Sequence, residues 1–276
     1  MVVIDGITTE FIDINRGVPQ GTVLGPILFS LIVNDIQLAD PRRNLMVKFA
    51  DDITISIPVS KDSTNATIDE VNSMKHCAAR NRMTLNLSKT WEMLIHGKTT
   101  KPNPQPVPGI ERESWLKLLG IKFQENPCCW DLHVDKLIAK ASSGLYILRV
   151  CKFYGYSQDQ LNKLFDSLIL SLFAYGLKVW GSACKKYLDR IDNFCKGAYR
   201  YGYTAKADFE ISSLIEERDK LLFNKITSTK DHLLQDMLPP KRSRMLRKRG
   251  HEFQLPQIRT GRYKNSFMNR CLFQFV

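Results

Sequence analysis

Residues 47–57, which run VKFADDITISI, decide the fold of the first part of the chain. From Ile53 to Ile57 isoleucine alternates with threonine and serine, and this period of two is typical of a β-strand with one buried face. The pair Asp51 and Asp52 stands between two apolar runs, where such a strand would turn back. The stretch therefore predicts a β-hairpin with two adjacent carboxylates at its turn.

Two adjacent carboxylates can approach one metal ion at a turn, whereas successive residues within a strand point to opposite faces. Mg²⁺ is a hard cation that takes one or two protein carboxylates together with substrate phosphates, and polymerases use pairs of such ions for phosphoryl transfer. Asp51 and Asp52 are therefore candidate metal ligands. A solvated turn would contain the same two residues, so the pair alone does not exclude that alternative.

The surrounding sequence predicts a layer of mixed strands and helices. Residues 2–16 alternate apolar and polar side chains around an Asp-Gly pair, which predicts a hairpin. Pro26 precedes the apolar run 27–33, a composition that suits a helix buried between layers. A helix is expected over 63–81 and a strand over 84–95. The expected fold class is α+β.

The second half of the sequence predicts helices only. Four prolines within 101–109 exclude a helix there and indicate an extended connection. Apolar residues recur at helical spacing over 134–148, and residues 157–160 have the form of a capping box that begins another helix. Two further helices are expected near 185–200 and 208–226.

The formal net charge of +12 arises from 40 basic and 28 acidic residues and favours an anionic partner such as nucleic acid. Residues 238–276 contribute much of this charge. Their basic run would contact phosphates with an affinity that falls as salt rises, although a nuclear import sequence or a solvated, disordered tail has the same composition. The basic residues concerned are Lys241, Arg242, Arg244, Arg247, Lys248 and Arg249.

The seven cysteines form no CxxC pair and no regular pattern, so neither a disulfide framework nor a zinc module is indicated. The most apolar stretch, 168–180, is too short to cross a bilayer. We therefore expect an intracellular protein of the nucleus or cytoplasm with no membrane partner.

Residues 16–29 run RGVPQGTVLGPILF and are followed by FADD at 49–52. Together they resemble motifs B and C of reverse transcriptases, in the same order and at similar spacing. In that family motif B is a Pro-Gln-Gly corner and helix beside the template and the incoming nucleotide, and motif C is a hairpin with two aspartates. The residues that the resemblance assigns to template and nucleotide binding are Pro19, Gln20, Gly21 and Phe49.

Two further stretches extend the resemblance. Residues 85–90 (LNLSKT) are similar to motif D, in which Lys89 would protonate the departing pyrophosphate or steady its charge. Residues 118–121 (LLGI) resemble the primer-grip region and imply that Leu119 and Gly120 lie near the primer. Each has an ordinary alternative. The lysine could be solvated, the primer-grip residues a buried strand end, the motif B corner a helix-entry turn, and the motif C phenylalanine plain core.

Residues 173–181 (FAYGLKVWG) are similar to a helix that follows the thumb in LINE-type, jockey-like mobile elements, which are non-LTR retrotransposons. The resemblance thus covers almost the whole chain. It implies a partial polymerase palm over 1–125, an all-α thumb and post-thumb region over 126–237, and a basic C-terminal tail over 238–276.

The implied activity is RNA-directed DNA synthesis by two-metal nucleotidyl transfer with Mg²⁺ or Mn²⁺. The implied partners are an RNA template, a DNA primer and deoxynucleoside triphosphates, with element-encoded RNA in a ribonucleoprotein as a further one. Motif A, which supplies the first metal-binding aspartate, and the fingers have no counterpart here, and Asp5 and Asp13 lie in the hairpin before motif B. We therefore expect an N-terminally truncated fragment that is inactive alone. The alternative is a non-catalytic nucleic-acid-binding protein derived from a retroelement.

Overall fold

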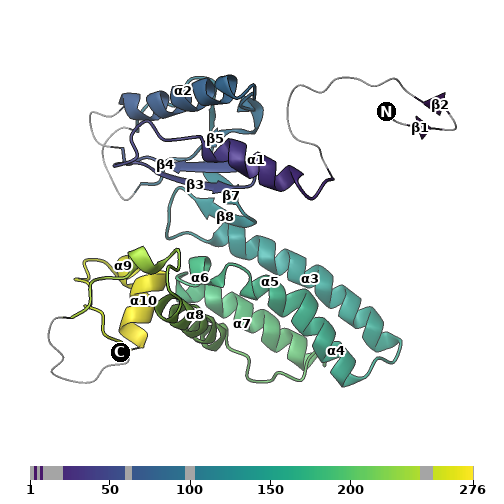
Figure 1. Cartoon of the computed structure of the whole chain (residues 1–276). Helices are drawn as coiled ribbons and strands as arrows, with labels where there is room; N and C mark the ends of the chain where they lie inside the picture. Colours follow the sequence, from purple (N-terminus) through teal and green to yellow (C-terminus); the bar gives the residue numbers. More distant parts are fainter. Residues whose placement is uncertain are drawn as a thin grey trace. The chain divides into compact units, whose positions relative to one another are not determined.

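A computed structural model describes residues 3–4, 7–8, 21–59, 64–96, 103–242 and 251–275. The chain divides into two compact units (Figure 1). The first comprises residues 1–94 and 98–113, and the second comprises residues 95–97 and 114–276. Strands and helices both occur, so the protein is of the mixed α+β type that the sequence predicts.

The described residues of the first unit form three pairs of strands and two long helices. Strands β1 and β2 pair antiparallel, as do β3 and β4, whereas β5 and β6 pair parallel. The elements are β1 (Val3–Ile4), β2 (Ile7–Thr8), α1 (Gly25–Asn34), β3 (Leu45–Phe49), β4 (Asp52–Ser56), α2 (Thr64–Arg80), the 3₁₀ turn η1 (Leu87–Lys89), β5 (Trp91–Glu92) and β6 (Glu111–Arg112).

The core of the first unit lies between α1, α2 and the β3–β4 hairpin. Val33 from α1 and Met74 from α2 are buried there, and Ile53 and Ile55 of β4 pack against them. The predicted alternation along β4 is therefore confirmed, because its isoleucines face this core.

One strand prediction for this unit is wrong, and one hairpin prediction is confirmed in its described part. The strand expected over 84–95 is wrong apart from β5, because local hydrogen bonds to Asn86 form a turn instead. Ser88 Oγ donates to Asn86 Oδ1 at 2.7 Å and Thr90 Oγ1 donates to the Asn86 carbonyl at 2.8 Å, and such bonds compete with a strand ladder. The pairing of β1 with β2 agrees with the predicted N-terminal hairpin, whose expected continuation over 11–14 lies outside the described residues.

The second unit is one β-hairpin followed by helices. The elements are β7 (Trp115–Leu118), β8 (Ile121–Gln124), α3 (Asp131–Phe153), α4 (Gln158–Phe165), the π-helical turn η2 (Asp166–Leu170), α5 (Ser171–Ala174), α6 (Leu177–Trp180), α7 (Lys185–Arg200), α8 (Ile211–Ser228), the 3₁₀ turn η3 (Gln235–Met237), α9 (Gly261–Asn265) and α10 (Phe267–Gln274). Helix α3 packs against α4, α5 and α7 (Figure 1).

The helices of this unit confirm the sequence predictions for residues 131–226, among which no strand occurs. The capping box before α4 is present, since Ser157 N donates to Gln160 Oε1 at 2.9 Å and Ser157 Oγ accepts from Gln160 N at 3.4 Å. Fully buried Phe165, Ile169 and Phe173 follow one another along the continuing helix and form the centre of the core.

A second, smaller core joins α8 to the C-terminal helices. Phe223 and Ile226 of α8 are buried together with Met268 and Leu272 of α10. Residues 251–275 are therefore folded, so the C-terminal basic region is not a disordered tail along its described part. Among the described residues no helix combines the length and apolar character that a membrane span requires.

Candidate active site

The two adjacent carboxylates lie at the turn of the β3–β4 hairpin. Phe49 pairs with Asp52, which leaves Ala50 and Asp51 as the turn. Ala50 has φ +50°, and a non-glycine residue in this left-handed region costs about 1–2 kcal/mol. Both aspartates are exposed. The predicted hairpin is confirmed, with the second aspartate placed at the start of β4.

The hairpin is tied to helix α1 by Lys48. Its ammonium donates to the carbonyls of Val33 at 2.9 Å, Asn34 at 3.2 Å and Ile36 at 2.7 Å. Carbonyls at a helix C-terminus lack intrahelical partners, and a cation is favourable there. Sequence reasoning missed this residue, although Lys48 pairs with inward-facing Ile53 and so shares its face.

A second anchor is Glu70 on α2, which is 1% exposed. It accepts hydrogen bonds from Ala39 N at 2.9 Å, Asp40 N at 3.0 Å and Asn44 Nδ2 at 2.6 Å. Burial alone would raise the pKa of Glu70, but these hydrogen bonds outweigh it and lower that pKa. The carboxylate of Glu70 therefore holds in place the loop that leads from α1 into β3.

The motif B corner is described only in part, because Pro19 and Gln20 lie outside the described residues. Gly21 has φ +76°, and a Cβ added there would meet no atom within 4 Å. Gly25 N donates to Thr22 Oγ1 at 3.0 Å at the start of α1. Pro26 lies in the first turn of this helix, as predicted.

Helix α1 and strand β3 each leave apolar side chains exposed, which corrects the expectation of a helix buried between layers. Of the α1 residues only Gly25 and Val33 are buried, because the helix contacts described neighbours along one side only. Phe49 is 60% exposed, so it is not a core residue. The exposed side chains are Val23 and Leu24 just before α1, Ile27, Leu28 and Leu31 of α1, and Leu45, Val47 and Phe49 of β3; we call them the exposed apolar side chains.

The acidic residues of the hairpin suit one hydrated cation better than two cations. Within the described residues, no group of three or more His, Cys, Asp or Glu side chains could hold a metal ion. Two exposed carboxylates fit a Mg²⁺ that retains most of its water. A pair of ions about 3.5–4 Å apart would need more negative charge than Asp51 and Asp52 provide.

Lys89 is exposed at the end of η1. Among the described residues, no hydrogen bond or ion pair joins its ammonium to Asp51 or Asp52. The sequence assignment of Lys89 to pyrophosphate therefore stays a prediction.

The residues assigned to the primer grip form the tip of the β7–β8 hairpin, in the second unit. Leu119 has φ +45° and Gly120 has φ +87°, and two left-handed residues are typical of a tight hairpin turn. Leu119 is 50% exposed, so this is not a buried strand end. Tyr175 Oη donates to the Leu119 carbonyl at 2.7 Å, and Lys136 Nζ donates to the Gly120 carbonyl at 3.4 Å.

The segment between α5 and α6 packs against this hairpin tip. Gly176 has φ +61°, and a Cβ there would collide with Ile121 of β8. Trp180 Nε1 donates to the Tyr175 carbonyl at 2.9 Å, and the Trp180 side chain is fully buried. Sequence reasoning used residues 173–181 only for their family resemblance and missed this support, although a Tyr-Gly break between two apolar helices indicates a tight approach.

Only Lys241 and Arg242 of the basic run are described; Arg244, Arg247, Lys248 and Arg249 lie outside the described residues. Lys241 forms an exposed ion pair with Glu252 at 2.8 Å. Arg242 Nη2 donates to the His251 carbonyl at 2.6 Å. These two cations are thus partly engaged by the chain itself.

Comparison with known proteins places this geometry in context. Residues 1–123 match the protein-family model described as reverse transcriptase (RNA-dependent DNA polymerase). The chain is 23% identical over 260 residues to a probable RNA-directed DNA polymerase from transposon BS of Drosophila melanogaster, which covers 85% of this chain and 29% of that protein. It is 27% identical over 199 residues to the corresponding protein from transposon X-element of the same organism, covering 67% of this chain and 21% of that protein.

The chain therefore spans less than a third of the length of these curated relatives. No solved structure matches it.

Proposed function

We propose that the chain is part of a reverse transcriptase of a LINE-type element and that its first unit is part of the palm of this RNA-directed DNA polymerase. The observation that carries the proposal is the β3–β4 hairpin, whose strained turn presents Asp51 and Asp52 to solvent inside the segment that matches the family. Its substrates would be an RNA template, a DNA primer and deoxynucleoside triphosphates.

Each residue of the hairpin has a role in this proposal. Asp51 and Asp52 would bind Mg²⁺ or Mn²⁺, which neutralises phosphate charge and activates the primer 3′-hydroxyl when bound. Lys48 holds the hairpin against α1, and Glu70 of α2 holds the loop before β3, which limits the motion of the carboxylates. Phe49, exposed on β3, would lie against the nucleotide or template.

The proposal also assigns a substrate contact to each of the remaining residues. Pro19, Gln20 and Gly21 would lie beside the nascent base pair, where a glycine permits close approach of the backbone. Lys89 would donate a proton or positive charge to the departing pyrophosphate. Leu119 and Gly120, at the supported tip of β7–β8, would contact the primer.

For the second unit we propose a thumb role for the helices that follow the primer-grip hairpin. The hydrogen bonds of Tyr175 and Lys136 to the hairpin tip couple the tip to these helices. A thumb that moves would therefore carry the grip with it. The basic run 241–249 would add phosphate contacts that weaken as salt rises.

Among the described residues no third acidic group joins Asp51 and Asp52, and two carboxylates alone hold two divalent cations poorly because the ions repel one another at short range. We therefore propose that the 276-residue polypeptide, assayed alone, does not extend a primer. A non-catalytic nucleic-acid-binding protein derived from a retroelement is the second candidate, and it is favoured by the same shortage of acidic ligands among the described residues.

Binding of Mn²⁺, followed by electron paramagnetic resonance, tests the metal assignment. We expect one weak site that is lost in the Asp51→Asn/Asp52→Asn variant and retained in Asp69→Asn, a matched change at an exposed acid of α2. Equal binding in all three proteins would remove the hairpin from the metal site.

Primer extension on an RNA template tests the chemistry, with Mg²⁺ or Mn²⁺ supplied in excess. We expect no incorporation by the polypeptide. Incorporation that Asp51→Asn abolishes would show that two carboxylates suffice, and would contradict the charge argument.

A further inference from the structure

Helices α3 and α7 end close together in the second unit, and the chain there exposes aromatic side chains. Residues at the ends of the two helices and just beyond them carry large exposed rings. Phe153 is 84% exposed, Tyr154 74% and Tyr201 70%, with Tyr156 and Tyr199 nearly half exposed. Large apolar groups left in contact with solvent are typical of binding surfaces. We call these five side chains the aromatic cluster.

The two segments of the cluster are joined by Lys152. Its ammonium donates to the Tyr201 carbonyl at 2.7 Å and lies 5.7 Å from the centroid of the Tyr203 ring. The rings of Tyr201 and Tyr203 stack, with centroids 6.0 Å apart and planes 30° apart. Gly202 has φ +66°, a left-handed conformation that favours glycine, and a Cβ there would lie 2.5 Å from the Lys152 Nζ and displace it. The rings are thus carried on a fixed backbone.

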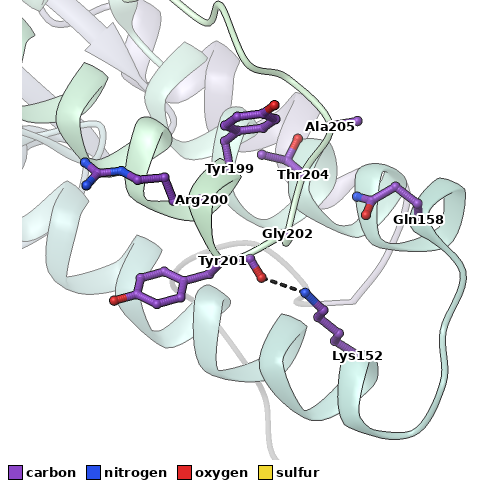
Figure 2. Close-up of a pocket in the computed structure, with 8 residues that line it drawn as sticks. All are labelled: Lys152, Gln158, Tyr199, Arg200, Tyr201, Gly202, Thr204 and Ala205. Carbon is purple, nitrogen blue, oxygen red and sulfur yellow. Dashed lines mark hydrogen bonds between the residues drawn. The ribbon is translucent and has the colours of Figure 1, made fainter.

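An open hollow of about 580 Å³ lies between the segments. Lys152 and Gln158 line one side, and the turn from Tyr199 to Ala205 lines the other (Figure 2). The volume falls within the range of about 300–1,000 Å³ found for ligand sites. Of the aromatic cluster, Tyr199 and Tyr201 line it together with Lys152 and Arg200, and it lies outside residues 1–123, which match the family model.

The charge around the hollow is positive. Residues 149–160 and 196–206 contain five basic side chains and one acidic side chain, Asp159. Lys206 is neutralised by Asp166 at 2.6 Å, but Arg149 and Arg200 take part in no ion pair among the described residues. Cations free of protein partners next to exposed rings match the two parts of a nucleotide, its phosphate and its base.

From this arrangement we infer that the aromatic cluster binds single-stranded RNA or DNA. Unpaired bases stack on the rings of Tyr154 and Tyr201, and Arg200 contacts the backbone between them. A duplex hides the faces of its bases, so it binds this surface less well than a single strand does. The inference goes beyond the proposed polymerase function, since it needs neither the β3–β4 hairpin nor a metal ion.

The test uses the full chain with the six basic residues of the run 241–249 replaced by glutamine, so that the C-terminal contacts do not mask the cluster. Fluorescence anisotropy of a labelled 12-nucleotide single-stranded RNA is measured in EDTA, where polymerase chemistry plays no part. We expect the Tyr154→Ala/Tyr201→Ala variant to bind roughly five- to tenfold more weakly for each ring removed. Both side chains are mostly exposed, so circular dichroism should show an unchanged fold.

Tyr263→Ala is the matched control, because this tyrosine of α9 is 48% exposed and lies outside the cluster. It should bind like its parent, and a 12-base-pair duplex should bind the parent more weakly than the single strand. An unchanged affinity in the double variant, an equal loss in Tyr263→Ala, or duplex binding as tight as single-strand binding would each overturn the inference.

Discussion

The buried histidine of the second unit makes stability depend on pH in a way that can be measured. His133 is 1% exposed and lies between the rings of Trp130 and Trp180, with centroid distances of 6.0 and 5.7 Å. Its Nδ1 accepts from Lys122 N at 3.4 Å, and its Nε2 has no hydrogen-bond partner among the described residues. Burial, together with the charges of Lys136 and Lys122, lowers the pKa of His133 to about 4.

The size of this change in the free energy of unfolding follows from the difference in the pKa of His133 between the folded and unfolded states. An unfolded histidine takes up its proton near pH 6.5, whereas the folded one does so near pH 4. The unfolded state therefore binds more protons between these values, and stability present above pH 6.5 is lost as the pH falls toward 4. The free energy of unfolding should drop by about 3 kcal/mol over this window through His133 alone.

Urea unfolding followed by tryptophan fluorescence at pH 7.5, 5.5 and 4.5 measures this effect. His133→Gln cannot gain a proton, yet its amide can still accept from the Lys122 backbone, so the variant should lack this part of the pH dependence. His76→Asn, a change at an exposed histidine of α2, is the control and should behave like the parent. If the parent and His133→Gln lose equal free energy between pH 7.5 and 4.5, the reasoning is wrong.

Three substitutions test the supports of the two hairpins. Ala50→Gly relieves the left-handed turn and should stabilise the β3–β4 hairpin by about 1 kcal/mol; faster amide exchange in its strands would contradict this. Lys48→Met removes three hydrogen bonds at the end of α1 and should cost about 2 kcal/mol in a urea melt, unlike Lys75→Met at an exposed site of α2. Tyr175→Phe loses the hydrogen bond to the Leu119 carbonyl and should lower the free energy of unfolding by about 1 kcal/mol. An unchanged urea unfolding curve would show that this bond does not stabilise the hairpin tip.

Local patterns were the part of the fold that sequence could predict. The β3–β4 hairpin and the capping box at Ser157 depend on residues within a few positions of each other, and both are confirmed. The prediction of a strand over 84–95 was wrong because the period of apolar residues carries no information about the hydrogen bonds to Asn86, which compete with those between strands.

The supports of the candidate site could not be predicted, because their partners are distant along the chain. Glu70 accepts hydrogen bonds from Ala39, 31 residues earlier, and from Asp40, 30 residues earlier. No local sequence pattern indicates contacts at such separations. The primer-grip residues were grouped with the palm, but Tyr175, 56 residues away from Leu119, holds them among the helices. The assignment of Leu119 and Gly120 to the functional palm stays a prediction.

The exposed apolar side chains of α1 and β3 lead us to expect association of this polypeptide at high concentration. Strands β3 and β4 pair only with each other among the described residues, and a two-stranded sheet with free edges and exposed apolar side chains is a template for intermolecular pairing. Its association should be hydrophobic and so strengthen on warming from 4 to 25 °C. In a cell, chaperones that bind such surfaces, rather than the aspartates at the turn, would set the lifetime of the free polypeptide.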